Sequence, residues 1–89
     1  MEVYITPGAQ KLIKKLPKIP QIAIIEKLQK IRLTGVINTV KLSGYKNVFR
    51  IRVGNYRVVY KVRDRIMYVF LVGHRKEVYK LLERLRIFE

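Results

Sequence analysis

The stretch Val48–Val72, VFRIRVGNYRVVYKVRDRIMYVFLV, decides the fold of this 89-residue chain. Most of it alternates between apolar and polar residues, many of them β-branched or aromatic, and this period of two is typical of strands. Two-residue turns are predicted at Gly54-Asn55, as a type II′ turn, and at Arg63-Asp64. The sequence therefore predicts a three-stranded antiparallel meander, with strands at Val48–Val53, Tyr56–Val62 and Arg65–Val72.

The segments on either side of the meander have helical periodicity. Thr6 followed by Pro7 is typical of a helix start, because a hydroxyl caps the first turn and proline suits its first position. The apolar residues that follow recur at helical spacing, and Gly35 stands where a second helix is expected to end. We expect a strand over Glu2–Thr6, helices over 7–16, 20–33 and 75–87, and a connection over 36–46.

This order of elements predicts one α+β domain over residues 1–89. It consists of an N-terminal strand, an αα-hairpin, a three-stranded antiparallel meander and a C-terminal helix. Cysteine is absent, which excludes disulfides and most structural zinc sites and fits a reducing cytoplasm. The longest apolar run, Ile66–Val72, is far short of the roughly 20 residues of a membrane span. We expect a cytoplasmic protein with no membrane partner.

Charge gives the first indication of function, because the chain carries a formal net charge of +14. Residues 41–80 hold eleven Lys and Arg against Asp64 and Glu77, and so contribute +9 of it. Basic residues concentrated in one half of a chain are typical of a surface that binds a polyanion. A solubilising surface with no partner is the alternative interpretation.

The predicted Gly54-Asn55 turn sorts side chains of the first two meander strands onto two faces. Phe49, Ile51, Val58 and Tyr60 point to the core, and the opposite face carries Arg50, Arg52, Arg57 and Lys61. Clustered arginines suit bidentate recognition of phosphate oxygens. With a turn at Arg63-Asp64, the third strand places Met67, Val69 and Leu71 on the core face. Its other face then carries Ile66, Tyr68, Phe70 and Val72 beside the arginines.

The closing helix is expected to cover part of this arginine face. A groove would then remain between helix and sheet, walled by Arg50, Arg52 and Arg57 and floored by aromatic rings, which suits single-stranded RNA or DNA. His74, Arg75 and Tyr79 follow at the mouth of the groove, with Arg75 and Tyr79 one helical turn apart. Each alone is more often an ordinary surface residue, and only their convergence suggests a site.

Four short motifs follow one another along the chain: Lys41-Leu42-Ser43-Gly44, Phe49–Tyr60, Val72-Gly73-His74-Arg75 and Glu77-Val78-Tyr79. Their residues and their order resemble the RelE/ParE toxin superfamily. The αα-hairpin fits as well, so the resemblance spans essentially the whole chain. Where the best-known family pattern has lysine, this chain has Arg50, Arg52 and His74, and an arginine is too firmly protonated to act as a general base.

The resemblance implies a RelE-like fold and a toxin of a type II toxin–antitoxin pair. RelE-like members cut mRNA in the ribosomal decoding site, so the implied partners are the ribosome, mRNA and a cognate acidic RelB-like antitoxin. ParE-like members instead inhibit DNA gyrase without nuclease activity, and this remains the alternative, followed by an RNA-binding module without catalysis. The implied catalytic residues are Arg50, Arg52, Arg57, His74, Arg75 and Tyr79, and the implied RNA-binding residues are Lys41, Lys46, Lys61 and Lys76.

The chemistry that these residues support is transesterification, in which an RNA 2′-hydroxyl attacks its own 3′-phosphate. The six acidic residues are scattered along the chain, so we expect neither a metal nor another cofactor. Arg50, Arg52 and Arg57 would neutralise the developing phosphorane, and Arg75 the phosphate and leaving oxygen. His74 is the candidate for proton transfer, and Tyr79 for stacking or for positioning the nucleophile.

Overall fold

The computed structural model describes residues 1–36 and 38–86, which form three helices and five strands. The predicted α+β class and element order are confirmed, with one additional short strand. In chain order the elements are β1 (Glu2–Ile5), α1 (Pro7–Lys14), α2 (Lys18–Thr34), β2 (Thr39–Lys41), β3 (Val48–Val53), β4 (Tyr56–Arg63), β5 (Ile66–His74) and α3 (Val78–Arg86).

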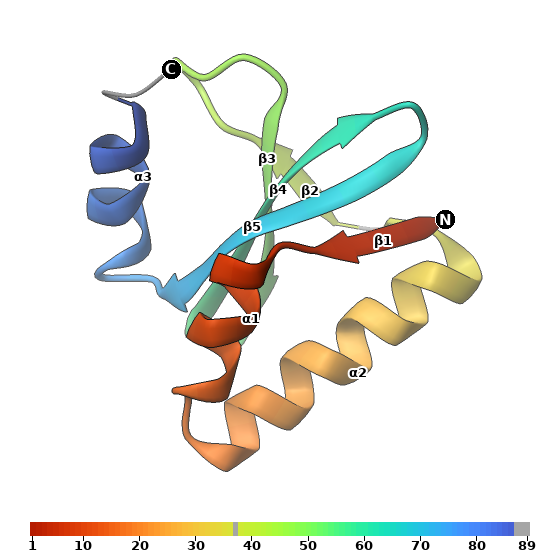
Figure 1. The fold of residues 1–89 in the computed structure, drawn as a ribbon, viewed down its shortest axis with the longest axis vertical. Coiled ribbons are helices and arrows are strands. Elements are labelled where there is room, and N and C mark those ends of the chain that lie inside the picture. The colour runs from red at the N-terminus through yellow and green to blue at the C-terminus, as the bar shows by residue number, and fades with distance from the viewer. Residues whose placement is uncertain (37, 87–89) are drawn as a thin grey trace.

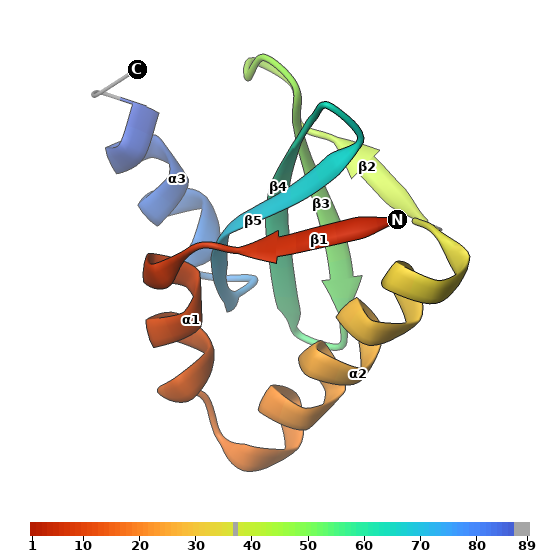
Figure 2. The same cartoon turned by 45° about the vertical axis from the view of Figure 1, so that its right-hand side comes forward.

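All five strands belong to one sheet with the order β1-β5-β4-β3-β2 (Figure 1). The predicted meander forms its centre, and β2, which was expected to be part of a connection, adds an antiparallel edge strand beside β3. The N-terminal strand β1 lies parallel to β5, with Glu2 opposite Ile66 and Ile5 opposite Val69 (Figure 2). The N-terminal segment of the chain is therefore hydrogen-bonded to the last strand.

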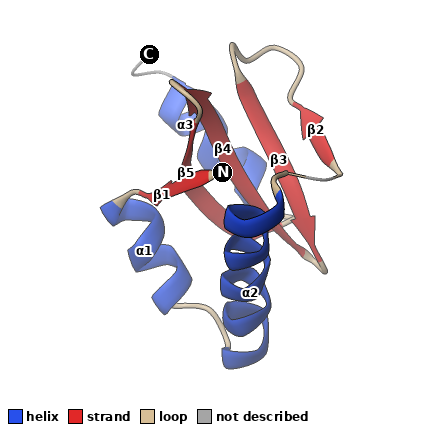
Figure 3. Ribbon diagram, turned by 90° about the vertical axis from the view of Figure 1, so that its right-hand side faces the viewer, coloured by secondary structure: helices blue, strands red, loops and turns tan. Residues whose placement is uncertain are grey.

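Each face of the sheet is covered by helices and has its own apolar core (Figure 3). On one face α1 and α2 pack on the sheet around Ile24, Ile51 and Tyr60, all buried. On the other face α3 packs through Val78 and Leu82. These two residues contact a buried patch of Val48, Val59 and Leu71.

The helix boundaries follow from the capping residues. Thr6 Oγ1 accepts a hydrogen bond from Ala9 N at 3.2 Å, and Pro7 occupies the first position of α1 as predicted. Helix α2 begins at Lys18, two residues earlier than predicted, since Pro20 falls within its first turn, where no amide hydrogen is required. It ends before Gly35, whose φ of +86° favours glycine.

The two meander turns differ in type. Gly54 has a φ of +58°, as the first residue of a type II′ turn requires, and Val53 lies opposite Tyr56 as predicted. The second turn consists of Asp64 and Arg65, with φ of +51° and +65°, which is typical of a type I′ turn. The predicted turn at Arg63-Asp64 was therefore wrong by one residue, and Arg63 pairs with Ile66.

A β-bulge between β4 and β5 corrects the predicted faces of the third meander strand. Val59 pairs with Leu71 and Tyr60 with Val69, so Phe70 is an extra residue in β5. Because one extra residue reverses the alternation beyond it, Val72 points into the core beneath α1 and α2 and Leu71 lies beneath α3. The prediction had placed Leu71 and Val72 the other way round.

None of the helices in the described part of the chain is both long enough and apolar enough to cross a membrane.

Candidate active site

Two turns meet at one end of the sheet and gather most of the predicted site residues. The β3–β4 turn at Gly54-Asn55 accepts a hydrogen bond from the turn after β5, since Arg75 N donates to Asn55 O at 2.8 Å. Within the second turn, Glu77 N donates to His74 O at 2.9 Å. Backbone hydrogen bonds therefore fix this end of the sheet. We call it the arginine end, and its residues are Arg52, Arg57, His74 and Arg75.

Arg57 is the most enclosed of these residues, with 7% of its surface exposed. It lies in β4 opposite Arg52 on one side and Gly73 on the other. Its Nη1 donates to Gly54 O at 3.1 Å and to Tyr56 O at 3.0 Å. The guanidinium is thus held by the turn itself, and its charge is fixed in position before any ligand binds.

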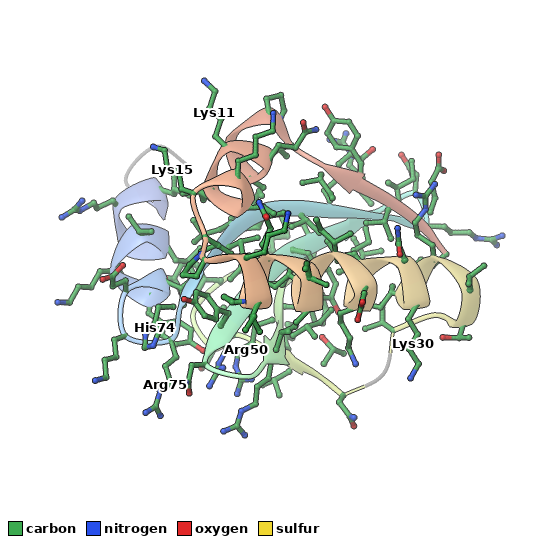
Figure 4. All side chains as sticks on the ribbon, turned by 90° about the horizontal axis from the view of Figure 1, so that it is seen from below. Lys11, Lys15, Lys30, Arg50, His74 and Arg75 are labelled. Carbon is green, nitrogen blue, oxygen red and sulfur yellow. The ribbon has the colours of Figure 1, made fainter. Side chains whose placement is uncertain are left out.

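Arg52 and Arg75 are exposed at the same end, and Arg50 is half-buried two residues further along β3. Figure 4 shows Arg50, His74 and Arg75 on one side of the molecule, whereas Lys11 of α1 and Lys15, which caps its C-terminal end, lie on the opposite side. The arginine end therefore combines one fixed cation with side chains that are free to approach a phosphate.

His74 is oriented by two contacts. Lys76 N donates to His74 Nδ1 at 3.2 Å, and the rings of His74 and Tyr56 lie edge to face at a centroid distance of 5.5 Å. When Nδ1 accepts a hydrogen bond, the proton of a neutral imidazole is on Nε2. His74 is thereby arranged to donate from Nε2.

Tyr79 lies in the first turn of α3 and is 38% exposed. The predicted helix began at Arg75, but α3 begins at Val78, because residues 75–77 form the turn that bonds to the β3–β4 hairpin. Arg75 and Tyr79 are therefore not neighbours on one helix face, and that prediction was wrong. Tyr79 instead follows the arginine end along the chain, as the second residue of α3.

The predicted groove between the closing helix and the arginines was also wrong. Val78 and Leu82 of α3 pack directly on Val48, Val59 and Leu71, so apolar side chains fill this space. Phe70, one of the expected floor rings, is partly buried against the same cluster. At the arginine end the structure instead has the exposed side chains of Arg52 and Arg75 beside two turns.

The four predicted RNA-binding lysines are distributed over three places. Lys76 is exposed in the turn after His74, at the arginine end. Lys41 pairs with Phe49 in the β2–β3 ladder and so belongs to the face of α1 and α2, away from the arginines. Lys46 and Lys61 line a pocket at the other end of the sheet.

Two residues that support the arginine end, Asn55 and Tyr56, were not predicted from the sequence. Asn55 contributes its carbonyl oxygen to Arg75 N, and Tyr56 packs on His74. The bulge creates the second contact, because it brings Tyr56 opposite His74. A backbone acceptor leaves no sequence signal, and the run of apolar residues in β5 hides the bulge.

The residues described by the structure include no group of three or more His, Cys, Asp and Glu side chains placed to hold a metal ion.

Comparisons with known proteins give a consistent result. Residues 3–79 match the model of the family described as the ParE toxin of a type II toxin–antitoxin system. Toxin RelE3 of Methanocaldococcus jannaschii is 46% identical over 39 residues, a match that spans 44% of each chain. Two solved structures are similar over most of their length. The RelB–RelE antitoxin–toxin complex from Methanococcus jannaschii has a TM-score of 0.73 at 28% identity, covering 84% of this chain and 93% of that one. The isolated E. coli RelE toxin has a TM-score of 0.68 at 27% identity, covering 94% and 97%.

Proposed function

Because this chain belongs to the RelE/ParE superfamily of toxins from type II toxin–antitoxin systems, as its motifs predicted, we propose that it is a RelE-type endoribonuclease. In this proposal it acts in the cytoplasm, where it cleaves mRNA on the ribosome and so inhibits translation. The observation that carries the proposal is the arginine end, where Arg52, Arg57, Arg75 and His74 meet at two bonded turns.

In the proposed reaction an RNA 2′-hydroxyl attacks the adjacent phosphorus and gives up its proton to water. The bond from phosphorus to the 5′-oxygen breaks, which leaves a 2′,3′-cyclic phosphate and a 5′-hydroxyl. Negative charge builds up on the phosphorane oxygens during this step, and donors fixed in advance stabilise such charge most effectively. Arg57 meets this requirement because its guanidinium is held by Gly54 O and Tyr56 O.

The exposed cations and the two ring side chains are assigned complementary roles. The guanidinium groups of Arg52 and Arg75 bind the phosphate, and Arg50 adds positive charge from the middle of β3. His74, whose Nδ1 accepts from Lys76 N, donates a hydrogen bond from Nε2 to the departing 5′-oxygen, which takes its proton from water. The exposed ring of Tyr79 stacks on a neighbouring base.

An antitoxin is the proposed protein partner. The similar RelE of Methanococcus jannaschii was solved as an antitoxin–toxin complex, and a chain of net charge +14 favours an acidic partner. Co-expression with the protein encoded beside it tests this proposal. A complex that copurifies and relieves growth arrest is the expected result, and a stable, harmless chain expressed alone would contradict it.

The decisive test of the function is primer extension on a message carried by translating ribosomes, with the same RNA free in solution as the comparison. We expect cuts within codons on the ribosome for the wild type and their loss in Arg75→Ala. Arg32→Ala is the matched control, because Arg32 is exposed at the end of α2. It removes the same charge from an element that covers the other face of the sheet.

A message left intact by the wild type would contradict the nuclease. The same preparation would then be tested in a DNA gyrase supercoiling assay, where trapped cleavage complexes would support the ParE-like alternative.

A further inference from the structure

A second basic region lies at the opposite end of the sheet from the arginine end. A pocket of about 790 Å³ forms there between the segment before β3 and the β4–β5 hairpin. Both segments lie at the same end of the sheet in Figure 1. We call it the hairpin pocket, and its lining residues are Lys46, Asn47, Lys61, Val62, Arg63, Asp64 and Tyr68.

The lining combines charge, an amide and an aromatic ring. Lys46, Lys61 and Arg63 supply three cations against the single carboxylate of Asp64. Tyr68 contributes a half-buried ring, which packs edge to face on Tyr4 of β1 at a centroid distance of 5.7 Å. The ring is therefore restrained by a neighbouring strand before any ligand enters.

Strand pairing places the hairpin pocket on the same face of the sheet as the arginine end. Lys61 lies between Val48 and Tyr68 in the ladder, and Val48 packs beneath α3. Arg57 and Arg63 are six residues apart on β4, which corresponds to about 20 Å along a strand. A ligand that reaches both ends must therefore be extended and must carry more than one negative charge.

We propose that the hairpin pocket binds a nucleotide of single-stranded RNA at a distance from the one that is cleaved. In this site Lys46, Lys61 and Arg63 contact the phosphate groups, and Tyr68 stacks on a base. The proposal extends the nuclease function proposed above to a second subsite that contributes affinity. An acidic peptide would use the cations alone, whereas the restrained aromatic ring and the Asn47 amide favour a nucleobase.

The test compares two double variants that remove the same charge. Lys46→Ala/Arg63→Ala removes two exposed cations of the pocket, and Lys15→Ala/Lys30→Ala removes two exposed lysines of the helical hairpin (Figure 4). Binding of a short fluorescent RNA oligonucleotide is titrated at several salt concentrations. We expect the pocket variant to bind about 10–30-fold more weakly at about 0.1 M salt. The slope of log K against log salt should fall in magnitude by about 1.4, which corresponds to two lost phosphate contacts.

Equal losses in the two double variants would overturn the proposal, because general charge would then explain the binding. The same titration with poly-glutamate tests for a peptide ligand, and an equal or larger loss there would also overturn it. Binding is measured without cleavage, so a protein that proves not to be a nuclease leaves this test intact. Conversely, if Lys46→Ala/Arg63→Ala leaves RNA affinity unchanged, this result does not contradict cleavage at the arginine end.

Tyr68 is tested by one substitution that keeps an aromatic ring and one that replaces the ring with an aliphatic side chain. Tyr68→Phe should retain RNA affinity and Tyr68→Leu should lose roughly 5- to 100-fold, as expected when one stacked base is lost. Circular dichroism confirms that both variants are folded, because Tyr68 also packs on Tyr4. Equal affinities of the two variants would refute the stacking.

The source of the RNA is decided by a further pair of titrations. Weaker binding of the free oligonucleotide by the pocket variant assigns the pocket to the message. Weaker binding of small ribosomal subunits without message as well would extend the site to ribosomal RNA, whereas a loss confined to these subunits would overturn a pocket for the message. Unchanged affinity for both ligands, relative to the Lys15→Ala/Lys30→Ala control, would overturn the proposal.

Discussion

The two ends of strand β4 are both basic, but they are built differently. At the arginine end a buried guanidinium is bonded to its own turn, and a second turn is joined to the first by a backbone hydrogen bond. At the hairpin pocket the cations Lys46 and Arg63 are exposed around an open space, and the turn consists of two residues at positive φ. Fixed charge suits the stabilisation of a transition state, and exposed charge suits the binding of a long polyanion.

The largest expected effect is on the rate of cleavage at the arginine end. Arg75→Ala keeps the backbone N–H that Asn55 O accepts, so we expect folding to be unchanged while cleavage falls about 10²- to 10³-fold. Single-turnover cleavage at saturating ribosomes measures this rate. A comparable loss in Lys46→Ala/Arg63→Ala at the same saturation would break the distinction between the two ends, because we expect that variant to lose affinity instead.

The second effect is on stability and concerns the two arginines of β4. Arg57→Met keeps a long side chain but removes both hydrogen bonds to the turn, which should lower the free energy of unfolding by about 1–3 kcal/mol. Arg63→Met at the other end is exposed and should change it by less than about 0.5 kcal/mol. Urea denaturation followed by circular dichroism measures both values, and equal values would show that Arg57 does not hold its turn.

A smaller effect distinguishes the two turns. Gly54→Ala places a side chain at a φ of +58° and should cost about 1 kcal/mol, although the space around it is open. Arg65→Gly removes a side chain from a φ of +65° and should stabilise the protein by about 0.5–1 kcal/mol. Thermal unfolding of the two variants gives the signs. A destabilised Arg65→Gly would mean that the arginine makes contacts that outweigh its strained backbone.

The smallest effect comes from Tyr60, between the two ends of β4 and on the opposite face. Burial raises the pKa of its hydroxyl above the usual value of 10.0, and the hydrogen bond with Thr39 Oγ1 at 2.5 Å acts in the opposite direction. A raised pKa of the folded state stabilises the protein fully below pH 10, and this contribution is lost as the pH rises further. The unfolding free energy of the wild type should therefore fall relative to that of Tyr60→Phe as the pH rises above 10. A parallel pH dependence of the two proteins would contradict this assignment.

The sequence predicted one hairpin of the sheet better than the other, for a physical reason. Between β3 and β4 a glycine marks the turn and polar residues alternate with apolar ones, so every pair from Val53–Tyr56 outward was correct. Between β4 and β5 the turn residues are Asp64 and Arg65, and β5 is apolar on both faces because helices cover both. Neither the turn nor the bulge at Phe70 has a local signal there.

The candidate site was predictable as a set of residues, but its construction was not. The alternation in β3 and β4 places Arg52 beside Arg57, and the short distance along the chain brings His74 and Arg75 to the same end. The support of that end depends on backbone atoms of Gly54, Asn55 and Lys76, whose side chains reveal nothing about these hydrogen bonds. The four predicted RNA-binding lysines lie on both faces and at both ends of the sheet. Their positions depend on the strand pairing, which the sequence predicted only in part.

The parallel pairing of β1 with β5 has a consequence for the order of events during synthesis. Strand β1 pairs with a strand that begins more than sixty residues later in the chain, since Glu2 lies opposite Ile66. Contacts so distant in sequence form slowly and late. His74 and Arg75 stand at the end of the same strand, so a nascent chain acquires its arginine end only after β5 has been translated. The proposed catalytic residues thus come together among the last contacts that the fold makes.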